Sequence, residues 1–236
     1  MGETGDIPKI GDGAAKQLKE IGYFRVTERG LGDYEKFCHF EGTKIGQNSV
    51  VVDVGSGWNQ ELSADLENLN MGIKTISLDA SLAISPEGIE GVNYKKGENG
   101  GDTHRVSEEE QRERLLKTRE NSVAAVMPEI PLKDGVADLV VDCYGPATYL
   151  GDEKWAEYVS EVGRILKNGG EAHMFPIDNF DNFVLNWDEN RSEVSANKRL
   201  NLLDEVLEER GLKLDRYSQD DEEGNVRVGV VIKKGI

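Results

Sequence analysis

Two aspartates in the sequence each follow a run of apolar and β-branched residues. Asp53 follows Val50-Val51-Val52 and stands just before Gly55-Ser56-Gly57, and Asp79 follows Ile76-Ser77-Leu78. Glycines let a backbone turn tightly and approach a ligand closely, and a carboxylate accepts charge-assisted hydrogen bonds from hydroxyl or ammonium groups. These residue types at the ends of two strands indicate a site for a ligand that carries positive charge and hydroxyl groups.

The elements that must position these aspartates are strands that alternate with helices. Leu62, Leu66 and Leu69 follow the glycine turn at helical spacing. Alternating strands and helices predict an α/β three-layer sandwich with a mainly parallel sheet. The acidic turn 220–224 predicts that the last two strands form a hairpin. The expected strands are 50–53, 74–79, 122–127, 137–142, 171–175, 212–217 and 226–232.

The helices flank this pattern on both sides. Two short helices are expected before the first strand, at 13–24 and 33–40, and a charge-rich helix is expected to begin at Ser107. Another is expected over 155–166, with Gly169-Gly170 as its left-handed cap. The last helix is expected to end at Gly211.

The chain divides into residues 1–48, an N-terminal tail with cap helices, and residues 49–236, one ligand-binding domain with a long loop at 82–105. Loops of this length in a compact domain are often functional. Two interpretations stay open: the loop folds over the ligand as a lid, or it is a surface insertion.

Composition excludes several classes of protein. The net charge of −17 over 236 residues leaves no basic footprint for nucleic acid. No apolar run suits a membrane span and no leader is visible, so we expect a cytoplasmic protein with a small-molecule substrate. Cys38 and Cys143 form no metal or disulfide pattern, and no metal site is expected. The oligomeric state stays open.

The helix start disfavours a dinucleotide. A dinucleotide fingerprint needs a third glycine, and Gln60 occupies that position. Glu61 stands in the first turn of the helix, where its charge repels phosphate. A carboxylate two positions before the first glycine suits instead a cationic ligand without phosphate.

The segment Asp53-x-Gly55-x-Gly57 resembles motif I of the class I S-adenosylmethionine (SAM) methyltransferases. Two later segments resemble the same family: Ile130-Pro131-Leu132 followed by Ala137-Asp138-Leu139-Val140-Val141, and Arg164-Ile165-Leu166-Lys167-Asn168-Gly169-Gly170. The resemblance covers roughly residues 49–233, in the family's own order of motifs.

This resemblance implies a Rossmann-like, seven-stranded, mostly parallel sheet with an antiparallel last strand. It implies SAM as cofactor, with S-adenosylhomocysteine as product, and methyl transfer to a nitrogen, oxygen or carbon atom of a small molecule. Asp142 and Tyr144 end the fourth strand and are candidates for catalysis, although pocket lining is favoured for both. The cofactor-binding residues expected are Asp53, Gly55, Ser56, Gly57, Asp79, Ala80, Met127 and Asp142.

Two alternatives remain from the sequence. A non-catalytic module with the SAM fold would bind a ligand or partner without turnover. A nicotinamide-dependent oxidoreductase is less favoured, because the glycine pattern and Glu61 argue against it.

Overall fold

A computed structural model describes residues 29–57, 60–69, 71–79, 93–95, 103–105, 121–178, 189–221 and 224–235. The expected helices at 13–24 and after Ser107, and the cofactor candidate Ala80, lie outside these residues. Within the expected loop 82–105, Asn93–Lys95 (β3) and Thr103–Arg105 (β4) form a small antiparallel ladder.

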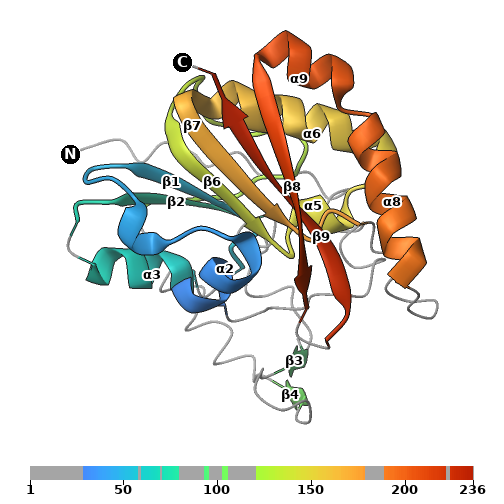
Figure 1. The fold of residues 1–236 in the computed structure, drawn as a ribbon. Helices are drawn as coiled ribbons and strands as arrows, with labels where there is room; N and C mark the ends of the chain where they lie inside the picture. Colours follow the sequence, from blue (N-terminus) through green and yellow to red (C-terminus); the bar gives the residue numbers. More distant parts are fainter. Residues whose placement is uncertain are drawn as a thin grey trace.

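The centre of the molecule is one seven-stranded sheet in the order β5-β2-β1-β6-β7-β9-β8 (Figure 1). The ladders join β1 to β2 and β6, β2 to β5, and β6 to β7 in parallel, while β9 is antiparallel to both β7 and β8. The predicted fold class is therefore confirmed, including the antiparallel last strand. The strands are β1 (Val50–Val54), β2 (Lys74–Leu78), β5 (Ser122–Val123), β6 (Ala137–Cys143), β7 (Leu166–Phe175), β8 (Leu212–Asp220) and β9 (Val226–Lys234).

Helices cover both faces of the sheet (Figure 1). One face carries α2 and α3, and the other carries α5, α6, α8 and α9. Their bounds are α2 (Leu31–Cys38), the 3-10 helix η1 (Gly42–Lys44), α3 (Glu61–Asn68), α5 (Pro146–Tyr149), α6 (Asp152–Ile165), α8 (Glu189–Asn201) and α9 (Asp204–Arg210).

Neighbouring residues of each central strand point into different cores, as expected for a sheet buried on both faces. Val51 belongs to the core formed with α2 and α3, whereas Val52 belongs to the core that contains Trp155 and Tyr158 of α6. In the same way, Val141 of β6 joins the first core and Val140 the second. This double burial explains the almost continuous apolar runs in the sequence.

Two predicted boundaries are wrong. The strand expected over 122–127 covers only Ser122–Val123. The helix expected over 155–166 covers Asp152–Ile165, but its cap is the extended residue Leu166 and not Gly169-Gly170. Both glycines lie instead inside β7, where Gly169 has a φ of 78° and the ladder with β6 shifts register. A bulge needs the same left-handed backbone as a helix cap, so the glycine pair fits both.

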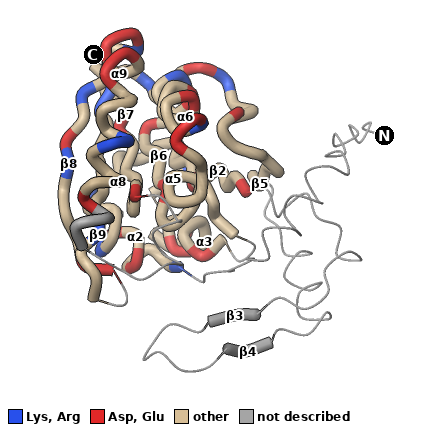
Figure 2. The backbone as a smooth tube through the Cα atoms, turned by 90° about the vertical axis from the view of Figure 1, so that its right-hand side faces the viewer, with Lys and Arg blue, Asp and Glu red and all other residues tan. Residues whose placement is uncertain are grey.

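Acidic residues appear along α3, α6 and α9 (Figure 2). Basic side chains gather at the amino ends of the parallel strands, where Arg164, Lys167, Arg210 and Lys234 line a cavity of about 450 Å³. Lys234 caps α6 there by donating to the Gly163 and Leu166 carbonyls, both at 2.8 Å. None of the helices in the described ranges is long and apolar enough to cross a membrane.

Candidate functional site

The glycine turn after β1 is fixed to the end of β2. Val54 pairs with Leu78, and the next amide, Gly55 N–H, donates to the Leu78 carbonyl at 2.8 Å. Gly57 N–H donates to Asp79 Oδ2 at 2.9 Å. Parallel register therefore places Asp53, the turn and Asp79 together at the carboxyl edge of two neighbouring strands.

Glycine is required at position 55 for two reasons. Its φ is 78°, a conformation that side chains rarely adopt, and a Cβ there would lie 2.7 Å from Gly145 Cα. A Cβ on Gly145 would in turn lie 2.7 Å from the Val54 carbonyl oxygen. The turn after β1 and the turn after β6 thus touch backbone to backbone, beside the point where the strand order reverses.

Asp53 is the buried carboxylate of the site, with 1% of its surface exposed. Its Oδ1 accepts a hydrogen bond from the Tyr34 hydroxyl at 2.8 Å, while Oδ2 has no partner among the described residues. Burial, and then the charges of Asp79 and Asp142, raise the pKa of Asp53 to about 7, and the Tyr34 hydrogen bond opposes this rise. Such a group costs folding free energy, so a donor or cation beside it would be bound favourably.

Gln60 occupies the position of the missing third glycine, and its backbone has the left-handed conformation that glycine adopts most easily. Its φ is 50°, and it forms the N-cap of α3. Its side chain is 1% exposed and accepts from the Ser122 hydroxyl at 2.9 Å, which ties the turn to β5. Glu61 lies in the first turn of α3, as the sequence predicted.

Asp142 organises the turn after β6. Its carboxylate is fully buried and accepts from Gly145 N–H at 2.9 Å, from Ala147 N–H at 2.7 Å and from the Tyr158 hydroxyl at 2.7 Å. Burial raises its pKa to about 6 against the lowering effect of these donors. These three hydrogen bonds show that Asp142 shapes the turn, and the catalytic and cofactor-binding roles expected for it stay predictions.

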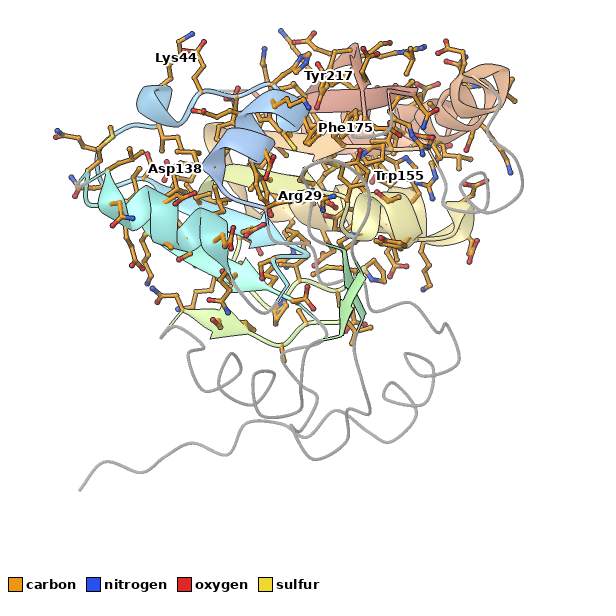
Figure 3. The ribbon with its side chains drawn as sticks, turned by 90° about the horizontal axis from the view of Figure 1, so that it is seen from below. Arg29, Lys44, Asp138, Trp155, Phe175 and Tyr217 are labelled. Atoms are coloured by element: carbon orange, nitrogen blue, oxygen red, sulfur yellow. The ribbon has the colours of Figure 1, made fainter. Side chains whose placement is uncertain are left out.

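Tyr144 has a strained backbone at the end of β6, with a φ of 56°. Its amide donates to the Phe175 carbonyl at 2.6 Å, and the Arg29 guanidinium lies 4.2 Å from its ring centre. Phe175 and Tyr217, which Figure 3 shows side by side, stack at 6.3 Å, and Phe37 of α2 stacks on Phe175 at 5.6 Å. These rings form an aromatic wall between α2 and the ends of β6 and β7.

Met127 lies in the segment after β5 and is partly buried against the hydrophobic core to which α6 contributes. Ala125 N–H donates to the Asp79 carbonyl at 3.4 Å, so this segment runs beside the end of β2. A cavity of about 690 Å³ is lined by residues 124–126 of this segment and by Ala156 and Ser160 of α6. The glycine turn does not line this cavity, and we therefore do not place a ligand of the turn there.

A buried ion-pair cluster lies at the end of β7. Arg227 Nη1 contacts Asp178 Oδ2 at 2.5 Å and its Nε contacts Asp221 Oδ2 at 3.0 Å, with all three side chains no more than 3% exposed. Ile177 N–H donates to the Val228 carbonyl at 2.9 Å. The cluster thereby fixes the β8–β9 hairpin to the segment that leaves β7.

Sequence reasoning missed Tyr34 and Arg29. The spacing of Tyr34, Phe37 and Cys38 indicates the buried face of a helix, and all three are buried. No pattern in the sequence connects Tyr34 with Asp53, which lies 19 positions later and on a different element.

No protein-family profile matches the sequence, and neither does any curated protein. Among solved structures, a SAM-dependent methyltransferase from Aquifex aeolicus is similar at 15% identity and a TM-score of 0.46, over 93% of this chain and 97% of that one. A SAM-dependent methyltransferase from Methanosarcina mazei is similar at 14% identity and a TM-score of 0.49, over 82% and 96% of the two chains.

Human N-acetylserotonin methyltransferase, solved in complex with SAM, is similar at 14% identity and a TM-score of 0.43, over 80% of this chain and 48% of that one. At identities and TM-scores this low, we base no functional conclusion on the similarity. The fold is established by the strand order and the ladders of this chain.

Proposed function

We propose that this protein is a SAM-dependent methyltransferase that acts on a nitrogen, oxygen or carbon nucleophile of a small molecule. The observation that carries the proposal is the pair Asp53 and Asp79, which flank a glycine turn at the carboxyl ends of neighbouring parallel strands. Open α/β sheets bind ligands at this edge, at the point where the strand order reverses. Here that point lies between β1 and β6.

The residues present fit SAM. Its sulfonium and ammonium groups are cationic, and Asp53 is a buried carboxylate with one oxygen that lacks a partner in the described structure. In our proposal Asp53 lies near the amino-acid end and the turn Gly55-Ser56-Gly57 packs beneath it. Asp79 receives the ribose hydroxyls, and Ala80 and Met127 border the adenosine.

SAM supplies an electrophilic methyl group on its sulfonium. The task left to this chain is to hold donor and acceptor in line, which can supply much of the rate. Tyr144 would border the acceptor at the end of β6. We assign no general base, because Asp142 is buried and accepts hydrogen bonds from three protein donors.

Calorimetric titration with SAM and, separately, NADH tests this function. We expect the wild type to bind SAM, and we expect Asp79→Ala to weaken that binding by about tenfold or more, because hydrogen bonds to a charged group are lost. Asp134→Ala is the matched control, since this carboxylate is 80% exposed and precedes β6 at the opposite edge of the sheet.

Other results would lead to the alternatives. A preference for NADH would mean a nicotinamide-dependent oxidoreductase. Tight SAM binding without methyl transfer to amine, hydroxyl, thiol and carbon acceptors would mean a non-catalytic binding module. Binding of neither compound would refute the proposed function.

A further inference from the structure

The short helix α2 contributes a side chain to the site from outside the strand, turn and helix that form it. Tyr34 is 3% exposed, and its hydroxyl donates to Asp53 Oδ1 at 2.8 Å. One carboxylate oxygen is thereby occupied, and the bond restricts the rotation of the carboxylate. The other oxygen, Oδ2, is buried and has no partner among the described residues.

A neutral hydroxyl that donates to a carboxylate favours its charged form. The Tyr34 bond does so here, against burial, which is the main cause of the raised pKa of Asp53. Burial, together with the charge of Asp53, holds the pKa of Tyr34 well above its ordinary value, so Tyr34 remains a neutral donor. The titratable groups that surround the pair are Cys38 from α2, Asp79 from the end of β2, Asp142 and Cys143 from β6, and Tyr158 from α6.

Helix α2 is held firmly enough to keep Tyr34 in place. At its start, Leu31 N–H donates to Asp65 Oδ2 of α3 at 2.7 Å. At its end, the Phe37 carbonyl accepts from the Tyr217 hydroxyl at 2.9 Å and the Cys38 carbonyl accepts from His173 Nδ1 at 2.6 Å. The helix is therefore attached to α3, β8 and β7, in addition to its bond with β1.

We propose that Tyr34 is a positioning residue of the cofactor site, which orients Asp53 and keeps it charged for the cationic end of SAM. This inference rests on the proposed function. It makes the segment before the first strand part of the ligand site, although the glycine turn and both aspartates come later in the chain.

Titration of SAM into wild type and Tyr34→Phe between about pH 6 and pH 8.5 tests the inference. Because the cation needs charged Asp53, wild-type affinity should rise as the pH passes through about 7, the pKa of that group. Tyr34→Phe keeps the ring but loses the donor. We expect affinity at pH 7 to fall by about tenfold and the midpoint of the rise to move to higher pH.

Tyr217→Phe is the matched control, since it also removes one tyrosine hydroxyl that anchors α2 but does not contact Asp53. We expect it to bind SAM as the wild type does, with the same pH midpoint. The decisive comparison is made in the Asp53→Asn background, where SAM binding should be weak and should lack the rise near pH 7, and where adding Tyr34→Phe should change nothing further.

Three results would overturn the inference. Equal SAM affinity and pH midpoint in wild type and Tyr34→Phe would refute it while leaving the proposed function intact. An equal loss in Tyr217→Phe, or an added loss in the Asp53→Asn background, would show that Tyr34 acts only through the stability of α2. Failure of the wild type to bind SAM would reject the proposed function and this inference together.

Discussion

At the scale of single residues, Asp53 lowers the stability of the folded protein at neutral pH, so selection for stability alone would not favour it. Its pKa in the folded protein is about 7, above the 3.8 of a free aspartate. The stability that it contributes is complete below about pH 4 and is lost as the pH rises toward and through 7. A residue that weakens the fold at neutral pH, in the strand that leads into a glycine turn, indicates a binding role.

We therefore expect Asp53→Asn to be more stable than the wild type at pH 8, by about 2 kcal/mol, after allowing for the buried amide donor that it introduces. At pH 4 the difference should vanish or reverse, because the wild-type carboxyl is then protonated. Urea unfolding of both proteins at the two pH values measures this. A wild type that is the more stable protein at pH 8 would contradict it.

Removing the cation from the buried ion pairs of Arg227 should destabilise the protein, whereas Asp53→Asn should stabilise it at pH 8. Arg227→Met leaves the carboxylates of Asp178 and Asp221 buried without this cation, and we expect a loss of about 3–5 kcal/mol in unfolding free energy. Lys233→Met is the control, because its pair with Asp215 is exposed and should contribute nothing measurable. Similar unfolding midpoints for the two variants would show that the Arg227 cluster does not stabilise the hairpin.

At the scale of elements, the β8–β9 hairpin depends on a glycine that leaves space for an aromatic ring. Gly229 faces Tyr217 across the ladder, and a Cβ at Gly229 would come close to the ring of Tyr217. That ring stacks on Phe175 and bonds to α2, so it has little freedom to move.

We expect Gly229→Ala to destabilise the protein by about 2 kcal/mol, because the ring must leave its position. Gly32→Ala supplies the contrast: it lies in α2 with nothing within 4 Å of the new Cβ, and we expect a gain of about 0.5–1 kcal/mol from helix propensity. Thermal unfolding of both variants measures these changes. An unfolding midpoint of Gly229→Ala equal to that of the wild type would mean that the Tyr217 ring is mobile.

The sequence predicted those elements whose pattern is local. The apolar runs before Asp53 and Asp79, and the turn between β8 and β9, predicted the sheet and its closing hairpin. The Gly169-Gly170 pair was misplaced because a helix cap and a strand bulge need the same backbone. Arg199 and Arg227 were not expected to be buried, since their partners lie far along the chain or on other elements. The bond from Tyr34 to Asp53 was missed for the same reason.

At the scale of the whole molecule, a net charge of −17 acts on stability as well as on partners. Like charges repel one another in the compact state, and dissolved salt screens that repulsion. We expect the thermal unfolding midpoint at pH 7.5 to rise between about 20 mM and 300 mM sodium chloride. Near the sequence pI of about 4.6 the same salt should have little effect. An unchanged midpoint at pH 7.5 would show that local ion pairs offset the net charge.

The close approach of Gly55 and Gly145 has a consequence for descent. The two positions lie 90 residues apart in sequence, yet neither has room for a methyl group while the other turn stays in place. Gly55 also has a φ of 78°, and a Cβ on Gly145 would meet Asp142 of its own turn at 2.6 Å. A lineage that replaces either glycine must therefore rebuild both turns, so we expect related chains to keep the pair. The pair would then be inherited as one character, and it offers a marker for recognising distant relatives of this protein.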